Sequence, residues 1–309
     1  MATSKTKQPA AGAGCHSALV LWRLLRPHTL TASFVPVLIG SALALASGHF
    51  RPSLAFMMLL SSLLLQSATN MFNEYYDYRR GLDHEESVGI GGAIVRDGVP
   101  AKWVLRIALG CSALALLLGV QIMQQSSWGI LPWGLGCIAV GYFYSGGPFP
   151  ISATPFGELA AGACMGLGII SISYFIHTVA LTPLVYLVSA APSVMIGAIL
   201  MANNIRDLRD DEAHGRKTLA VILGRDTAIR MLAGMFAISY IWVLALSASG
   251  LISPWTLLVL LSLPKALQAV AGFRQGTRPV EMMPAMVATA QANTVFGFLL
   301  ALGLILAQL

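Results

Sequence analysis

Two segments rich in asparagine and aspartate each end a long apolar stretch, and we call them the first and second acidic motifs. Residues 70–83 read Asn-Met-Phe-Asn-Glu-Tyr-Tyr-Asp-Tyr-Arg-Arg-Gly-Leu-Asp, and residues 203–217 read Asn-Asn-Ile-Arg-Asp-Leu-Arg-Asp-Asp-Glu-Ala-His-Gly-Arg-Lys. Carboxylate and amide oxygens are hard ligands that suit Mg²⁺, and neighbouring Arg and Lys side chains bind phosphate oxygens. The combination favours a diphosphate that Mg²⁺ bridges to the protein.

Each motif repeats Asn and Asp at spacings that fall on one face of a helix. These residues are Asn70, Asn73 and Asp77 in the first motif, and Asn203, Asp207 and Asp211 in the second. A carboxylate near a bilayer is costly unless it is paired, solvated or bound to a metal. Two such faces indicate a binding site rather than helix capping.

Magnesium ions in proteins commonly take one or two carboxylates together with phosphate oxygens and water. We expect Asp77 and Asp83 to bind one ion, and Asp207 and Asp211 another. Asn73, with Asn203 or Asn204, could add neutral oxygen ligands or orient the carboxylates. Metal ions placed there would neutralise the charge that grows on a departing diphosphate, so Asp77, Asp207 and Asp211 are the candidate catalytic residues.

Basic residues beside the motifs are the candidates for completing that neutralisation. The expected substrate-binding cations are Arg79, Arg80, Arg96, Arg206, Arg216 and Lys217, and the last two are favoured because they directly follow the second motif. Each could instead be a membrane-surface anchor, as loop Arg and Lys often are.

The composition is that of a polytopic membrane protein. Hydrophobic residues make up 56% of the 309-residue chain and charged residues only 10%, whereas a soluble domain has about 25% charged residues. Uncharged runs cover 27–50, 52–73, 107–157, 159–205, 231–264 and 282–309. Because one span needs about 20 residues, these runs predict an all-α protein of about nine transmembrane helices. The eighth is interrupted at Pro264-Lys265. We expect residues 1–20 to be a disordered tail and 21–309 to be a single transmembrane domain.

The basic residues predict the orientation in the membrane. With a cytoplasmic N-terminus and an external C-terminus, every Lys and Arg except Arg51 lies on the cytoplasmic side. All 13 Asp and Glu residues fall on that side too, which topology alone does not require. Both motifs end even-numbered spans, so we expect them to meet over one cavity at the cytoplasmic face.

Other classes of site are not indicated. The net charge of +6 suits an anionic lipid surface, but no basic helix or aromatic RNA-binding motif points to nucleic acid. Four scattered cysteines show no CxxC spacing, so neither a zinc site nor a disulfide framework is expected.

At its motifs the chain resembles the UbiA superfamily of intramembrane aromatic prenyltransferases, over nearly all of residues 20–309. The resemblance is closest to the branch that prenylates 1,4-dihydroxy-2-naphthoate. Besides the two acidic motifs, the segments that carry it are Arg26 to Ser33, Val88 to Val95, Tyr144 to Pro150, Thr154 to Glu158 and Gly215 to Ala220.

The resemblance implies a multi-pass enzyme of the bacterial cell membrane, with helices around a central cavity and its active site facing the cytoplasm. It implies transfer of a polyprenyl group from polyprenyl diphosphate to 1,4-dihydroxy-2-naphthoate, with loss of CO₂ and diphosphate, giving demethylmenaquinone. It also implies Mg²⁺ at Asn73, Asp77, Asp83, Asp207 and Asp211. Where the family usually has Asp after the first-motif Asn, this chain has Glu74, which we count as a metal ligand of longer reach.

The expected reaction passes through an allylic cation, which an electron-rich aromatic carbon attacks. Tyr144 is a candidate for contact with the substrate, and Tyr75, Tyr76 and Tyr142 could also shield the cation. Tyrosines at a membrane edge are equally often interface anchors.

Two rival functions stay open on the sequence alone. One is prenyl transfer to another acceptor, 4-hydroxybenzoate or homogentisate, or from a phytyl donor. The other is transport of a divalent cation or a lipid diphosphate, which would favour charges at mid-membrane and broken helices in matched halves.

Overall fold

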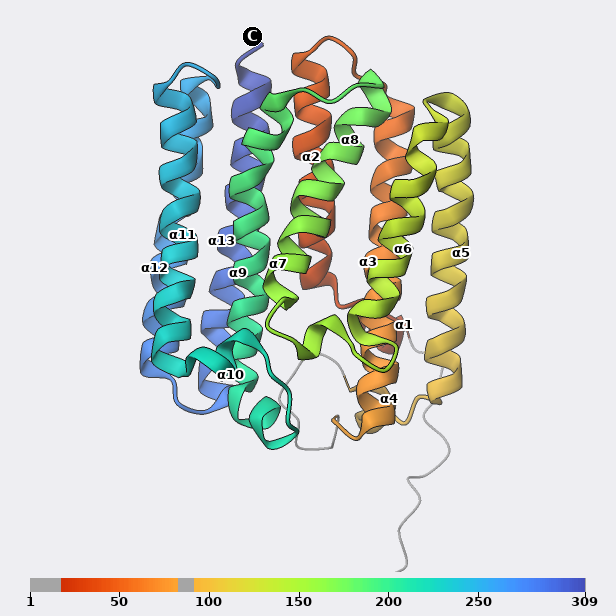
Figure 1. Cartoon of the computed structure of the whole chain (residues 1–309), viewed down its shortest axis with the longest axis vertical. Coiled ribbons are helices and arrows are strands. Elements are labelled where there is room, and N and C mark those ends of the chain that lie inside the picture. Colours follow the sequence, from red (N-terminus) through yellow and green to blue (C-terminus); the bar gives the residue numbers. More distant parts are fainter. Residues whose placement is uncertain (1–17, 83–91, 309) are drawn as a thin grey trace, which may run out of the picture.

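The computed structural model describes residues 18–82 and 92–308, and all regular elements within them are helices (Figure 1). At one end of the bundle lie the short helices α1 (Ala18–Leu25), α4 (Ala93–Arg96) and α10 (Leu219–Leu223). The bundle itself comprises α2 (Pro27–Ala46), α3 (Pro52–Arg80), α5 (Ala101–Gln125), α6 (Leu131–Ser145), α7 (Gly157–Ala161) with the π-helical η3 (Gly162–Gly168) and α8 (Ile169–Thr178), α9 (Pro183–Ala213), α11 (Arg225–Ala248), η4 (Pro254–Ser262) with α12 (Leu263–Gln275), and α13 (Pro279–Leu306).

Eight of these segments are long and apolar enough to cross a membrane, which confirms a polytopic helical protein. The eight do not include α6, which has 15 residues. A turn of 3₁₀-helix, η1 (Trp128–Ile130), leads directly into α6, and together they run beside α3 and α5 (Figure 1). Counting α6, the described part of the chain has the nine segments that the uncharged runs predict.

The eighth segment changes its helix type where the sequence predicts an interruption. Residues Pro254–Ser262 form a 3₁₀-helix, and a regular α-helix begins at Leu263. Pro264 occupies the first turn of that α-helix, where its missing N–H leaves no intrahelical bond unmade. The proline therefore starts a new helix instead of breaking one span into two.

The N-terminal boundary differs from the expected one. Helix α1 begins at Ala18, so the last residues of the predicted tail are helical, and Leu24 is buried against the bundle. Its length of eight residues is below that of a span, which explains why the hydropathy runs did not reveal it. Residues 1–17 lie outside the described structure.

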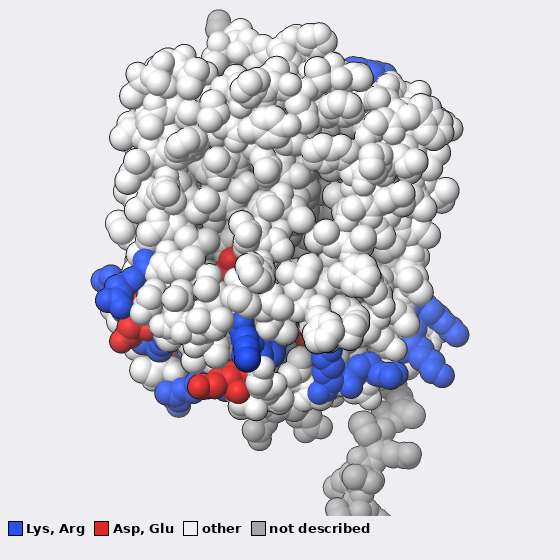
Figure 2. Space-filling view, viewed as in Figure 1, with Lys and Arg blue, Asp and Glu red and all other residues white. Residues whose placement is uncertain are grey.

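Charged side chains gather at the end of the bundle where α3 and α9 terminate (Figure 2). The two acidic motifs occupy the last turns of these helices, so the expectation that they share one end is confirmed. Arg51, at the start of α3, stands at the opposite end, where α13 also finishes (Figure 1). Which end faces the cytoplasm stays a prediction.

Candidate active site

A cavity of about 630 Å³ lies between the helices and has two chemically different sides. Helices α2 and α3 contribute hydroxyl and amide side chains, whereas η3, α9 and α13 contribute mainly apolar ones. The polar side includes Thr29, Ser33, Ser62, Gln66, Thr69 and Asn70, and the apolar side includes Met165, Ile196, Ile199, Leu200, Met283 and Met286. Such a cavity suits a ligand with a polar part and a long apolar part.

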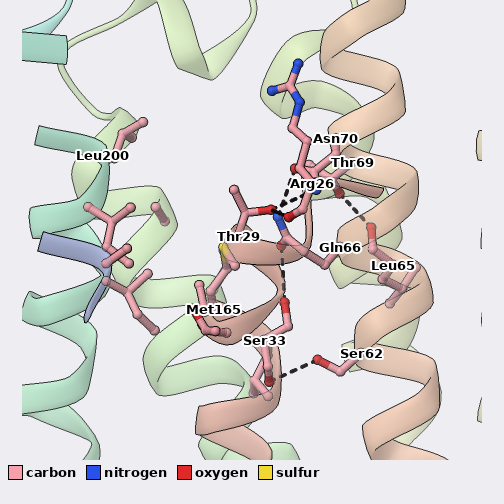
Figure 3. A pocket seen from close by; sticks show the side chains of 18 of the residues that line it. Arg26, Thr29, Ser33, Ser62, Leu65, Gln66, Thr69, Asn70, Met165 and Leu200 are labelled. Atoms are coloured by element: carbon pink, nitrogen blue, oxygen red, sulfur yellow. Dashed lines mark hydrogen bonds between the residues drawn. The ribbon is translucent and has the colours of Figure 1, made fainter. Parts of the chain in front are cut away.

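Hydrogen bonds join the polar side chains into a ladder that links α2 to α3 (Figure 3). Asn70 donates to the carbonyl of Leu25 at 3.0 Å and to Thr29 at 2.9 Å, and it accepts from Gln66 at 3.2 Å. Ser33 donates to Gln66 at 3.2 Å. Asn70, a predicted substrate-binding residue, therefore lines the cavity. Its amide hydrogens already bind Leu25 and Thr29, so its hydrogen bonds connect α3 to the segment around α1 and α2.

Among the first-motif carboxylates that the structure describes, Asp77 is the one without a direct partner; we call it open. It forms no hydrogen bond or ion pair with any residue that the structure describes, yet Arg216, Arg26 and Arg80 all lie within electrostatic reach. Asn73, one turn earlier, lines the cavity and accepts a hydrogen bond from Ser145 at 3.0 Å. A free carboxylate with arginines around it can bind a metal ion together with an anionic ligand.

Glu74 differs from Asp77 in that backbone N–H groups and an arginine bind its carboxylate. Its exposed fraction is 2%, and it accepts from the backbone N–H of Gly92 at 2.8 Å, from that of Ile94 at 3.2 Å, and from Arg26 at 2.9 Å. The structure therefore does not support the predicted metal-ligand role for Glu74. The extra methylene lets the carboxylate reach the start of α4, a contact that sequence spacing could not reveal.

In the second motif the two aspartates predicted to bind metal, Asp207 and Asp211, each have an arginine partner. Arg206 forms a forked contact with Asp207, at 2.7 and 2.6 Å. Asp211 is buried and pairs with Arg216 at 3.1 Å. Cationic side chains thus neutralise both carboxylates, and the buried charge of Asp211 requires such a partner.

The arginines of the two motifs converge on the loop that follows α6. Arg80 donates to the carbonyls of Ser145 at 2.7 Å and Gly147 at 2.9 Å. Arg216 donates to the carbonyl of Ser152 at 2.9 Å. We call residues 145–153 the strap, because these bonds tie it to both motifs.

None of the predicted cations lines the cavity, and several of them are exposed. The side chains of Arg79 and Lys217 are exposed, and the backbone N–H of Lys217 donates to the strap at Ala153, 3.0 Å away. Arg96 is exposed, with its guanidinium beside Gly92. Asp83 lies outside the described residues, so the structure does not place this predicted metal ligand.

Sequence reasoning missed Glu158, a buried carboxylate beside the second motif. Asn204 donates to Glu158 Oε1 at 2.8 Å, whereas buried Oε2 has no partner within the described structure. This contact turns Asn204 away from the cavity, which Asn203 and Tyr144 do line. Tyr144 lies within electrostatic reach of Glu158, Arg216, Asp77 and Asp211, and so stands between the motifs.

The donor set fits Mg²⁺ bound together with a substrate. No group of three or more His, Cys, Asp or Glu residues within the described ranges could hold a metal ion alone. A magnesium site formed from one or two carboxylates and substrate phosphates does not need such a cluster. Asp77 and Asp207 supply hard oxygen donors from the two motifs, and the nearby arginines suit the accompanying anion.

Comparison with known proteins agrees with this arrangement. The sequence model of the UbiA prenyltransferase family matches residues 33–290, and so includes both acidic motifs. The chain belongs to the UbiA prenyltransferase family. Among curated members of this family it is 52% identical, over 287 residues, to 1,4-dihydroxy-2-naphthoate octaprenyltransferase of Bacillus subtilis, covering 93% of this chain and 92% of the relative. It is 29% identical over 289 residues to human UbiA prenyltransferase domain-containing protein 1, covering 92% of this chain and 82% of that protein.

Solved structures of UbiA homologues share the fold. One from Archaeoglobus fulgidus, bound to GPP and Mg²⁺, has a TM-score of 0.65 at 17% identity and covers 91% of this chain and 99% of that one. An apo homologue from Aeropyrum pernix K1 has a TM-score of 0.66 at 15% identity, covering 92% and 98% of the two chains. The UbiA fold therefore extends over the whole described bundle.

Proposed function

We propose that this UbiA protein transfers a polyprenyl group from polyprenyl diphosphate to 1,4-dihydroxy-2-naphthoate, releasing CO₂ and diphosphate and forming the reduced, quinol form of demethylmenaquinone. The observation that carries the proposal is a mainly apolar cavity with hydroxyl and amide side chains on one side, lined by Asn73 and Asn203 of the two acidic motifs, in a chain 52% identical to the Bacillus subtilis octaprenyltransferase. Both substrates are amphipathic, and the two sides of the cavity match their two parts.

Asp77 and Asp207 are the proposed metal ligands, assisted by Asn73 and Asp211. The bound metal would stabilise the negative charge of the departing diphosphate. Arg80, Arg206 and Arg216 are proposed to exchange their present partners, the strap carbonyls and the Asp207 and Asp211 carboxylates, for phosphate oxygens. Arginine suits this exchange because its planar fork binds carbonyl, carboxylate and phosphate oxygens alike.

The residues that line the cavity surround the carbon atoms that react. As the bond between prenyl C1 and the diphosphate oxygen breaks, the ring carbon bonds to C1, and the carboxylate leaves as CO₂ while its bonding electrons return to the ring. The apolar side of the cavity excludes water from the allylic cation. Tyr144, which lines the cavity between the motifs, offers its ring face to that cation.

A reconstitution assay tests this function. Purified protein in nanodiscs is supplied with 1,4-dihydroxy-2-naphthoate, a polyprenyl diphosphate and Mg²⁺, and demethylmenaquinone and CO₂ are measured. We expect product that EDTA abolishes, and a loss of at least about 100-fold for Asp77→Asn and Asp207→Asn, because each substitution removes a charged ligand.

The matched control is Asp210→Asn, which alters an exposed carboxylate of the second motif paired only with His214. We expect it to retain activity. Product from 4-hydroxybenzoate but not from the naphthoate would reassign the acceptor, and no product from either would refute prenyl transfer.

A further inference from the structure

Three protein donors bind the carboxylate of Glu74. A carboxylate has about four lone-pair sites. Gly92 N–H lies 2.8 Å from both oxygens, Ile94 N–H lies 3.2 Å from Oε1, and Arg26 Nη2 lies 2.9 Å from Oε2. The side chain is 2% exposed, so neither water nor a metal ion has ready access. By contrast, Asp77, three residues later on the same helix, has no such partners in the described structure.

Arg26, the partner of Glu74, stands at the polar side of the cavity in an unusual backbone conformation. It joins α1 to α2 with φ 50° and ψ 64°, a left-handed geometry that disfavours residues with a Cβ. Such a conformation persists when surrounding contacts hold it. The guanidinium lines the cavity and lies within electrostatic reach of Asp77, and it has N–H groups beyond the one that binds Glu74.

On its other side Glu74 holds the residues where α4 begins. Gly92 has φ 96°, and a Cβ there would lie 2.6 Å from Arg96 Nε. The positive φ favours glycine at this position, and the backbone N–H groups of residues 92 and 94 both donate to Glu74. One carboxylate thus connects α3, the α1–α2 junction and the start of α4.

We propose that Glu74 is a positioning residue rather than a metal ligand. It fixes Arg26 at the cavity so that the free part of the guanidinium binds the diphosphate of the prenyl donor. The position of Arg26 favours the diphosphate as its anionic ligand. The guanidinium lies within electrostatic reach of Asp77, the proposed ligand of the metal ion that accompanies the diphosphate. The role of Arg26 rests on the proposed function, whereas the connection through Glu74 does not.

The decisive variant is Glu74→Gln, which keeps the volume but removes the charge. Hydrogen exchange at the amides of Gly92 and Ile94 should accelerate about tenfold or more, because charged hydrogen bonds are lost. The KM for polyprenyl diphosphate should rise about tenfold while that for the naphthoate stays unchanged. Mn²⁺ binding in the presence of inorganic diphosphate, followed by electron paramagnetic resonance, should stay within about twofold of wild type, unlike in Asp77→Asn.

Arg26→Lys tests the same connection from the other partner and preserves charge. Since Glu74 keeps its backbone donors, the amides of residues 92 and 94 should stay protected while the donor KM rises. Asp97→Asn is the matched control, because it breaks the exposed Arg23–Asp97 pair, 2.9 Å long, that also joins α1 to the end of α4. It should change none of the three measurements.

Three results would overturn the proposal. Mn²⁺ binding weakened in Glu74→Gln as far as in Asp77→Asn would make Glu74 a ligand. Unchanged amide exchange in Glu74→Gln would remove the connection, and a rise in the naphthoate KM alone would assign Arg26 to the acceptor. If the wild type transfers no prenyl group, the proposed function fails, but the exchange data still decide what Glu74 holds.

Discussion

At the residue level, the acidic side chains of the two motifs divide by what they contact. Asp77 is open, Asp207 and Asp211 are each paired with an arginine, and Glu74 is enclosed by backbone N–H groups and Arg26. A carboxylate paired with an arginine shares its negative charge with that cation and so attracts a metal ion less strongly than an unpaired one. We therefore expect metal binding to begin at Asp77 and to draw in the second motif afterwards.

Arg216 provides a test of forked arginine contacts. It pairs with Asp211 and also donates to Ser152 in the strap, so we expect Arg216→Lys, a point charge, to lose one of the two contacts. Turnover should fall about tenfold, as expected for one lost charged hydrogen bond. Arg209→Lys, an exposed change in the same motif, is the control. Equal kinetics for the two variants in the reconstitution assay would contradict this role.

Glu158 should matter for stability through Asn204. Glu158→Leu leaves the buried Asn204 N–H without its acceptor, which costs about 1–3 kcal/mol, whereas Glu158→Gln keeps a carbonyl oxygen at that place. We expect a thermal midpoint lower by several degrees for the leucine variant and nearly unchanged for the glutamine variant. Light-scattering or tryptophan-fluorescence melts in detergent measure the difference, and equal midpoints would show that the hydrogen bond contributes little.

Local periodicity explains which site residues the sequence could predict. Because a helix of known period continues through each motif, the sequence predicts that its Asn and Asp residues share one face. These residues are Asn70, Asn73, Asp77 and Asn203. The roles of Glu74 and Arg26 are not predictable in this way, because Glu74 contacts Gly92, 18 positions later, and Arg26, 48 positions earlier. Glu158 did leave a signal: it alone separates the uncharged runs 107–157 and 159–205.

At the level of elements, close contact between η3 and α9 shapes the apolar side of the cavity. A Cβ on Gly166 would clash with Ser193 Oγ and lie 2.5 Å from Ser193 Cα, so only glycine fits. The contact coincides with the π-helical turn Gly162–Gly168, and π-helical turns are frequent at functional sites. Met165, within this turn, lines the cavity. Helix geometry and cavity shape are therefore linked here.

Gly166→Ala should destabilise the bundle, because overpacking typically costs about 1–3 kcal/mol. The matched control is Gly110→Ala on α5, where an added Cβ has open space and alanine favours the helix by about 0.5–1 kcal/mol. Thermal melts should shift in opposite directions for the two variants. A shift of the same sign and size for both would contradict the packing argument.

At the level of the whole molecule, charge separates the two ends of the bundle. The motifs, the strap and α10 share the charged end, while Arg51 and the end of α13 lie opposite (Figures 1 and 2). The sequence predicted this separation because each uncharged run has the length of one span or two. From the positive-inside rule we predict that the charged end faces the cytoplasm.

Cysteine labelling tests this orientation in intact cells. In a background without native cysteines, Arg51→Cys should react with a membrane-impermeant maleimide added outside. Lys217→Cys, also exposed, should react only after permeabilisation. The reverse pattern would place the charged end outside the cytoplasm.

The strap also limits how this chain can vary in length. Surface loops ordinarily accept inserted residues at little cost, since closing a slightly longer loop requires only a small additional entropy. Here arginine bonds hold Ser145 and Gly147 on one side and Ser152 on the other, each to a different motif. An insertion at either tied point would pull an arginine away from the proposed metal-binding carboxylates. Pro148 and Phe149 lie between the tied points and before the 3₁₀ turn Ile151–Ala153, so we expect descendants of this sequence to gain or lose residues there rather than elsewhere in the strap.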